Sequence, residues 1–312
     1  MDGSPLAAGF IFRYHNLEQA HNITWPSNKC FICFCCESLF LTAMRSTRLP
    51  GLFVDKRTVF SEYLQREVKL DFFVPQDITG RSDMDLLLIN DGQHLHEMGL
   101  DRMLSELYAA GRIGPLFCVG IHAGPDRKME YGVSSQPDYE GRGGKAGAYT
   151  SFILQELLPY ISDQFRIKSY KEKAFAGFSL GALMALDIVL NHAPLFSRAG
   201  LFSGSFWWRS LEQQHRDYND DQHRIMQQVI RNGPYQPGLK FFFQCGNMDE
   251  TLDRNNNGII DSIDDTLDVI KELVAKGYDR EKDIFYLEMP DGKHDIATWA
   301  RAMPVFLEWI QG

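Results

Sequence analysis

A glycine-flanked serine, an acidic pair and a late histidine are the residues of this chain whose types and order suit acyl transfer. Gly177, Ser179 and Gly181 form a G-x-S-x-G pattern between an apolar, strand-like run and an amphipathic helix. The pattern alone is common, but its strand-turn-helix context is typical of a nucleophile elbow, which holds a serine hydroxyl at a helix N-terminus. Only glycine fits beside the serine in so tight a turn. We therefore predict Ser179 as a nucleophile, with a simple helix start as the alternative.

A serine hydroxyl is a weak nucleophile near neutral pH and needs a base that a carboxylate orients, in the chain order serine, acid, histidine. His294 lies between the last expected strand and the last expected helix, and is predicted to be the base. Asp249 follows an apolar strand and is predicted to be the acid, with Glu250 as the alternative. Both carboxylates could instead solvate a loop or cap the helix that follows.

The oxyanion of acyl transfer needs two fixed N–H donors. One comes from the residue after the nucleophile and the other from an earlier loop at a strand end. Leu180 and Gln93 are predicted to supply them, because Gln93 follows an expected strand and Gly92 lets the backbone approach closely. His94 and His96 have the spacing of a metal-binding pair, but no acidic partner lies nearby, so a metal is not expected there.

The elements that must position these residues alternate along the chain from residue 58 onward. Strands are predicted at 68–72, 86–89, 116–119, 174–178, 199–202, 240–244 and 284–287, the first preceded by a possible hairpin partner. Helices are predicted near 100–111, 152–157, 181–191, 221–231, 264–276 and 296–310. This alternation predicts an α/β protein with a mostly parallel, doubly wound sheet and helices on both faces. No linker or repeat divides residues 51–312, so they are predicted to form a single domain.

Composition and charge exclude several function classes. The chain has 312 residues and a formal net charge of −9, which argues against binding of nucleic acid or an anionic membrane through basic patches. A hydrophobic content of 44% and a charged content of 23% indicate a folded soluble protein. Residues 249–268 carry seven acidic side chains and a single arginine, so most of the net charge is local.

The first 50 residues do not read as part of the domain. No secretion signal starts at Met1, and the apolar run at 30–41 is too short to span a bilayer. We predict an N-terminal extension over 1–50, either disordered or the product of a non-native start codon, and a cytoplasmic protein. Four clustered cysteines lack the paired spacing of a zinc site: Cys30, Cys33, Cys35 and Cys36.

A segment just after the predicted acid matches the template of a calcium-binding loop. Oxygen-bearing side chains stand at positions one, three, five, nine and twelve, with glycine at six and a main-chain carbonyl at seven. The predicted ligands are Asp253, Asn255, Asn257, Ile259, Asp261 and Asp264. The run resembles the loops of dockerins and EF-hands, with aspartate in place of the glutamate at position twelve. The alternative is a turn that caps a helix without metal. Calcium here would be structural, since the chemistry requires no cofactor.

Together the motifs resemble the putative-esterase family of α/β-hydrolases, which includes esterase D, enterochelin-type siderophore esterases, feruloyl and acetylxylan esterases and the antigen 85 mycolyltransferases. The resemblance runs from about Arg66 to Trp309. Its marks are 88–93, 156–159, the elbow at Ser179, 203–208, 246–249, and 292–295 with Trp299. It implies an α/β-hydrolase fold with Ser179 as nucleophile, Asp249 as acid, His294 as base, and the N–H groups of Gln93 and Leu180 as the oxyanion hole. One departure is Ala182, where the family usually has a second glycine.

We therefore expect a serine carboxylic-ester hydrolase that forms an acyl-enzyme on a sugar, hydroxycinnamoyl, siderophore or similar small-molecule ester. An acyltransferase with the same triad is the first alternative, and a non-catalytic, calcium-stabilised binding domain is the second. Trp207 and Trp208 either wall the acyl pocket or pack in the core. Arg127 either contacts substrate or pairs with Glu130. No nucleic-acid or membrane partner is expected, and the oligomeric state stays open.

Overall fold

The structure, a computed structural model, describes residues 51–75 and 84–312. The extension predicted over 1–50, with its cysteine cluster, lies outside the described residues. Within the described part, strands alternate with helices as the sequence predicts. The strands are β1 (Leu52–Ser61), β2 (Arg66–Pro75), β3 (Asp85–Asn90), β4 (Leu116–Ile121), β5 (Lys173–Phe178), β6 (Arg198–Phe202), β7 (Lys240–Met248) and β8 (Ile284–Lys293).

These strands form one sheet with the order β1-β2-β4-β3-β5-β6-β7-β8. The hairpin of β1 and β2 is antiparallel, as is the pairing of β2 with β4, and all later pairings are parallel. The carboxyl ends of β3, β5, β6, β7 and β8 therefore lie at one edge of the sheet. The loops that leave this edge carry the predicted site residues.

Helices follow the strands in sequence. They are α1 (Leu95–Met98), α2 (Leu100–Ala109), α3 (Arg127–Glu130), α4 (Ala146–Ser151), α5 (Leu158–Phe165), α6 (Leu180–Asn191), α7 (Asp220–His223), α8 (Ile225–Asn232), α9 (Asp261–Lys276) and α10 (Ile296–Trp309). A 3₁₀ turn (Gly92–His94) precedes α1, and a π-helical segment (Phe152–Leu157) joins α4 to α5. None of the helices in 51–75 and 84–312 is long and apolar enough to cross a membrane.

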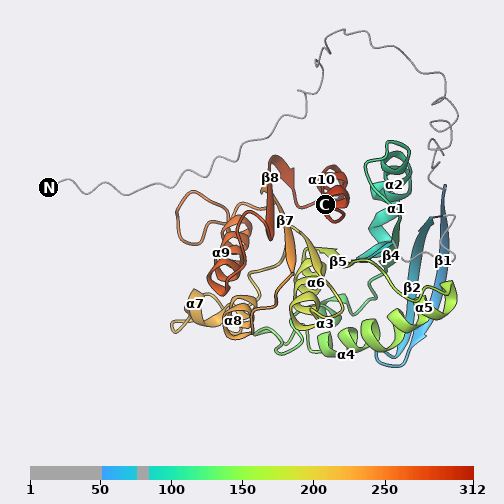
Figure 1. Ribbon diagram of the computed structural model, residues 1–312. Coiled ribbons are helices and arrows are strands. Elements are labelled where there is room, and N and C mark those ends of the chain that lie inside the picture. The colour runs from blue at the N-terminus through green and yellow to red at the C-terminus, as the bar shows by residue number, and fades with distance from the viewer. Residues whose placement is uncertain (1–50, 76–83) are drawn as a thin grey trace, which may run out of the picture. The chain divides into compact units, whose positions relative to one another are not determined.

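Both faces of the sheet are covered. Along β3, Leu86 and Leu88 belong to one buried cluster, while Leu87 and Ile89 belong to the other. Helices α6, α8 and α9 pack over the first face, and α1, α2 and α10 over the second (Figure 1). Because side chains alternate along a strand, a strand that is buried on both faces must be apolar at nearly every position. This explains why these strands stand in the sequence as continuous apolar runs.

The last two strands extend further than their apolar runs predict. β7 continues from 244 to Met248, and β8 from 287 to Lys293. Here the backbones of Gly246 and Gly292 lie so close that a Cβ on Gly246 would come within 2.4 Å of Gly292. Because the residues of this stretch are polar, a hydrophobicity pattern does not reveal the end of either strand. Glycine at positions 246 and 292 allows the two backbones to come this close.

The helix predicted over 221–231 is divided at Arg224, which has an extended backbone (φ −78°, ψ 110°).

Packing of α10 against the sheet depends on Phe306, which is fully buried. Its ring centroid lies 5.4 Å from that of Phe202 and 5.3 Å from that of Phe242, and a Cβ on Gly200 would meet it at 2.4 Å. Phe306→Ala is expected to lower the free energy of unfolding by about 3–5 kcal/mol, because it leaves a cavity that the sheet cannot fill.

The matched control is Phe60→Ala on β1, where the ring is 57% exposed. A surface change of this kind is expected to alter the free energy of unfolding by about 0.5 kcal/mol or less. Urea unfolding followed by circular dichroism measures both. Equal midpoints for the two variants would show that α10 is not held by this contact.

Candidate active site

Ser179 stands between β5 and α6 in a strained backbone conformation. Its φ is +56° and its ψ −121°, and its side chain makes no capping hydrogen bond to α6. A positive φ costs a non-glycine residue on the order of 1–3 kcal/mol and persists only where neighbouring contacts impose it. Here the Ser179 N–H donates to the Phe202 carbonyl at 2.9 Å, and the Ser205 N–H donates to the Ser179 carbonyl at 3.2 Å. The Ser179 and Ser205 hydroxyls lie 3.2 Å apart.

The two glycines of the pattern are required by close packing. A Cβ on Gly177 would lie 2.3 Å from the Gly181 carbonyl oxygen, and a Cβ on Gly181 would lie 2.7 Å from a carboxylate oxygen of Asp91. Either contact is too short for real atoms. The turn therefore brings β5, the start of α6 and the loop after β3 into contact, with the partly exposed Ser179 where they meet.

Asp249 and His294 follow β7 and β8 at the same edge of the sheet as Ser179. Both Asp249 carboxylate oxygens are buried, and burial raises the pKa of this carboxyl above its usual value. The Ser203 hydroxyl and His294 oppose that shift, although neither oxygen has a partner with hydrogen-bonding geometry among the described residues. A buried carboxylate beside an imidazole favours the protonated ring. The pair is thus arranged to stabilise an imidazolium.

His294 is exposed to solvent, and its ring and that of Trp299 pack edge to face with centroids 5.3 Å apart. Desolvation lowers the pKa of His294 below 6.5, while Asp249 raises it. Arg127 also lowers this pKa, and Asp295 raises it. The ring is therefore neutral near pH 7 and available to accept a proton.

The neighbouring Glu250 faces a different set of groups. Burial raises the pKa of its carboxyl, and the charges nearby are those of Asp261, Asp265 and Asp249. His294 is not among the groups that shift it. Electrostatic contact with the imidazole thus distinguishes Asp249 from the alternative acid.

The loop after β3 forms a tight turn next to the elbow. Asp91 has a left-handed backbone (φ +60°), and a Cβ on Gly92 would lie 2.4 Å from the Gly120 backbone of β4. The Gln93 side chain donates to Asp91 at 3.2 Å and accepts from the Ala123 N–H at 3.0 Å. Leu180 is the first residue of α6, so its N–H has no partner within its own helix. The side chain of Gln93 is thus engaged with Asp91 and Ala123.

The structure corrects the suggested pairing of Arg127 with Glu130. Both lie on α3, but Arg127 forms a two-pronged ion pair with Asp91, and Glu130 forms one with Arg66 of β2. The fold places α3 next to both the start of β2 and the turn after β3, so each of its charged residues has a partner on another segment. Sequence distance favoured the local pair, whereas the two real partners are 36 and 64 residues away.

The two tryptophans lie in different surroundings. Trp208 is fully buried, with its ring against Gly132 and Gly143. Trp207 is half-buried, and the guanidinium groups of Arg142 and Arg209 lie 5.0 and 5.9 Å from its ring centroid. Arginine over a tryptophan face is a favourable cation–π arrangement. The sequence analysis assigns no role to Ser205, although it lies in the 203–208 motif, and none to Arg142 or Arg209, because no local pattern links these residues to Ser179 or Trp207.

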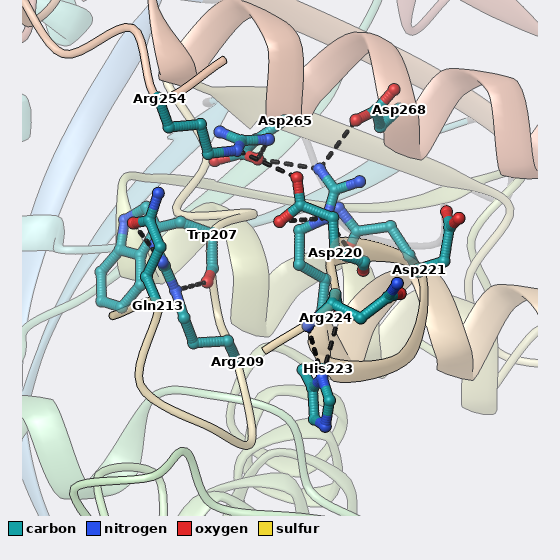
Figure 2. Close-up of polar contacts among 12 residues, drawn as sticks. Trp207, Arg209, Gln213, Asp220, Asp221, His223, Arg224, Arg254, Asp265 and Asp268 are labelled. Carbon is teal, nitrogen blue, oxygen red and sulfur yellow. Dashed lines mark hydrogen bonds and ion pairs between the residues drawn. The ribbon is translucent and has the colours of Figure 1, made fainter. Parts of the chain in front are cut away.

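A network of two arginines and several aspartates joins the segment after β6 to α9 (Figure 2). Arg224 contacts Asp265 at 2.9 Å and Asp268 at 2.8 Å. Arg254 contacts Asp265 at 2.7 Å, and Asp220 at 3.1 Å. Burial raises the pKa of Asp265 to about 6 against the opposing effect of both guanidinium groups. Much of the acidic segment is therefore neutralised internally.

The predicted calcium loop is only partly assembled for a cation. Asn255 and Asn257 both donate their side-chain amides to Asp264 at 2.8 Å, and Asp253 accepts the backbone N–H groups of Asn257 and Gly258. Asp261, at position nine, instead contacts Arg254 at 3.2 Å. Among the residues that the structure describes, no three His, Cys, Asp or Glu side chains are grouped closely enough to hold a metal.

A parallel sheet with a strained serine elbow after a central strand, and acidic and histidine loops at the same edge, defines an α/β-hydrolase. The particular family follows from the sequence: the profile of the family described as "Putative esterase" matches residues 61–310. The chain belongs to this family, which confirms the resemblance inferred from the motifs. Membership supports ester hydrolysis as the class of activity.

Two curated relatives come from Bacillus subtilis (strain 168), and both are uncharacterized. YjcH is 20% identical over 250 residues, which cover 79% of this chain and 92% of YjcH. YbbA is 23% identical over 148 residues, or 46% of this chain, and the match spans only 58% of YbbA.

Several solved structures share the fold. A ferulic acid esterase has 18% identity and a TM-score of 0.62, with 84% of this chain and 98% of that chain covered. The enterobactin esterase FES from Shigella flexneri has 20% identity and a TM-score of 0.64, with 84% and 59% covered. The siderophore hydrolase EstB from Aspergillus nidulans has 17% identity and a TM-score of 0.63, with 83% and 95% covered. At such identities the likeness concerns the fold.

The electrostatic surroundings of His294 lead to a direct test. Its imidazole is expected to titrate below 6.5, and Asp249→Asn is expected to lower that pKa further, because it removes the carboxylate that stabilises the imidazolium. NMR titration of the histidine ring signals, with His294 assigned from a His294→Gln variant, measures both values. Glu250→Gln is the control and should leave the titration unchanged. A His294 pKa that does not respond to Asp249→Asn would contradict the contact.

Proposed function

We propose that the protein is a serine carboxylesterase in which Ser179, His294 and Asp249 form a catalytic triad. The observation that carries the proposal is the left-handed φ of Ser179 at the end of β5. Such strain has no use at an ordinary helix start, but in a nucleophile elbow it presents the serine hydroxyl at the sheet edge, and His294 and Asp249 follow strands that end at the same edge. The neutral state of His294 near pH 7 supports its role as base.

In the proposed reaction, the Ser179 hydroxyl oxygen attacks the ester carbonyl carbon while His294 takes its proton. The N–H groups of Gln93 and Leu180 bind the oxyanion, and Asp249 stabilises the imidazolium. The carbonyl re-forms as the alcohol departs with the proton from His294, which leaves an acyl-enzyme. Water then gives a proton to His294 and attacks the acyl carbon, and the proton returns to Ser179 as the acid is released.

Covalent labelling tests the nucleophile. A fluorophosphonate probe is expected to label the wild type, and Ser179→Ala should abolish labelling and lower kcat by roughly 10⁶-fold, as expected when a triad serine is removed. Ser205→Ala is the matched control, because the Ser205 hydroxyl lies beside that of Ser179 but does not stand in a nucleophile elbow. Labelling that survives Ser179→Ala would overturn the assignment.

The acid is tested by two neighbouring substitutions. Asp249→Asn is expected to lower kcat by about 10³- to 10⁴-fold, as when the carboxylate that orients a triad histidine is lost. Glu250→Gln should change kcat little, since Glu250 is not among the groups that shift the pKa of His294. Steady-state kinetics on any ester that the wild type hydrolyses measures both. The reverse pattern would make Glu250 the acid.

We propose aromatic esters as the first substrates to examine. The solved neighbours are described as esterases of ferulic acid and of enterobactin, and as a siderophore hydrolase. The half-buried Trp207, with Arg142 and Arg209 near its ring, would suit an aromatic or anionic group.

Product analysis with water and sugar acceptors separates a hydrolase from an acyltransferase. A wild type that no probe labels would favour the non-catalytic binding domain.

We also propose that residues 253–264 bind a structural calcium ion. Support comes from the template match and from the way Asn255 and Asn257 meet Asp264 through their amides. Rotation of those amides would turn their oxygens toward Asp264 and create a pocket that a cation can fill. Asp261 would remain with Arg254 unless calcium displaces the guanidinium.

Calcium removal tests this site. Saturating calcium added to EDTA-treated protein is expected to raise Tm by about 5 °C, because an ion that binds only the folded chain stabilises it by mass action. Asp264→Asn should abolish the shift, whereas Asp279→Asn, an exposed turn residue outside the loop, should not. Equal Tm values with and without calcium would dismiss the proposal.

A further inference from the structure

A buried ion pair joins α3, the turn after β3 and the elbow. Nε and Nη2 of Arg127 each donate to one oxygen of Asp91, both at 2.7 Å. Nη2 also donates to the Phe178 carbonyl at 3.3 Å. Asp91 is 1% exposed. Because Asp91 opens the turn that carries Gln93 and Phe178 precedes Ser179, one guanidinium connects the predicted oxyanion donor to the nucleophile.

The other side of Asp91 is equally constrained. Its carboxylate lies against Gly181, where a Cβ would come within 2.7 Å. Its N–H donates to the buried Tyr131 hydroxyl at 3.3 Å, and the Asn90 side chain donates to the Gly181 carbonyl at 2.8 Å. These contacts hold Asp91 in its left-handed conformation, which aspartate adopts more readily than most residues. The turn after β3 is thus fixed from the side of α3 and from the side of α6.

We propose that the Asp91–Arg127 pair positions the oxyanion turn, so that Arg127 acts on the reaction by fixing the Gln93 N–H relative to Ser179. This inference rests on the proposed function, because it presupposes that an oxyanion forms beside Gln93. Arg127 is then a positioning residue. The planar guanidinium reaches both carboxylate oxygens and the Phe178 carbonyl together, whereas a lysine ammonium is a point charge that cannot reproduce this fork.

The same helix provides a matched pair with no link to the turn. Arg66 donates through Nε and Nη2 to the two oxygens of Glu130, at 2.7 and 2.6 Å. The acid is again 1% exposed, and the arginine is 17% exposed, against 29% for Arg127. Both pairs anchor α3, so loss of either should destabilise the fold in a similar way. Only the Asp91 pair touches the turn and the elbow.

Charge and geometry at position 127 can be separated. Arg127 is one of three charged groups that face His294, with Asp249 after β7 and Asp295 at the start of α10, and it opposes the two acids. Arg127→Met removes the positive charge, so the pKa of His294 should rise and the acid limb of kcat/KM should move to higher pH. Arg127→Lys keeps the charge but loses the fork, so the acid limb should stay in place.

The test compares Arg127→Lys and Arg127→Met with Arg66→Lys and Arg66→Met in the full-length chain. The readouts are Tm, kcat and KM for an ester that the wild type hydrolyses, the pH profile, and amide hydrogen exchange of residues 90–95. Both Arg127 variants are expected to lower kcat by about 100-fold with little change in KM, close to the loss of one oxyanion donor. Exchange in 90–95 should speed up. The Arg66 variants should lose similar Tm while kcat and exchange in 90–95 stay as in the wild type.

Each result decides between the two proposals. If kcat of the Arg127 and Arg66 variants falls in proportion to Tm, the Asp91–Arg127 pair is an ordinary stabilising contact and the inference is overturned. If the wild type neither reacts with a fluorophosphonate nor hydrolyses esters, the proposed function fails; faster exchange of 90–95 in Arg127→Lys alone would still show that the pair fixes the turn. Unchanged exchange in that variant overturns the inference whatever the activity.

Discussion

The close approach of three backbone segments around Ser179 is the constraint on which the rest of the structure depends. Gly177 meets Gly181, Gly181 meets the carboxylate of Asp91, and Gly92 meets the backbone of β4, each at a distance where a Cβ would overlap its neighbour. Glycine at these positions removes the atom that would keep the segments apart. With these segments in contact, two hydrogen bonds hold the strained backbone of Ser179: its N–H donates to the carbonyl of Phe202 in β6, and its carbonyl accepts from the Ser205 N–H in the following loop.

The two halves of the candidate site are held by different physical means. Around Ser179, the turn after β3 is held by the ion pair of the buried Asp91 with Arg127. Around His294 and Asp249, β7 and β8 approach each other through Gly246 and Gly292, and Asp295 caps α10 by accepting the Thr298 N–H at 2.8 Å. The first half tolerates no loss of a charged partner, because that would leave an uncompensated buried charge. The second half depends on the close fit of the β7 and β8 backbones.

The sequence predicted those parts of the fold that depend on local pattern. Strands buried on both faces appear as apolar runs, and the sequence alone assigns the residues that follow them, Ser179 and Asp249 among them, to one edge of the sheet. Contacts between distant segments could not be predicted. Nothing near Arg127 indicates Asp91, and nothing in the polar stretch before His294 indicates that β8 continues to Lys293. The ion pair and the length of β8 both depend on which backbone segments the fold brings together. Local patterns in a single sequence do not reveal this.

The acidic side chains that argue against nucleic-acid binding have specific partners in the folded chain. Of the seven acids in 249–268, three are neutralised by buried arginines: Asp261, Asp265 and Asp268. Asp249 faces His294, and Glu250 lies between these groups. The two remaining acids are Asp253 and Asp264. They lie in the loop where the side-chain amides of Asn255 and Asn257 donate to Asp264. Arg254 therefore supplies from within the chain part of the positive charge that a bound cation would otherwise provide. The acidic segment thus lies beside Asp249 with much of its charge already balanced by Arg224 and Arg254.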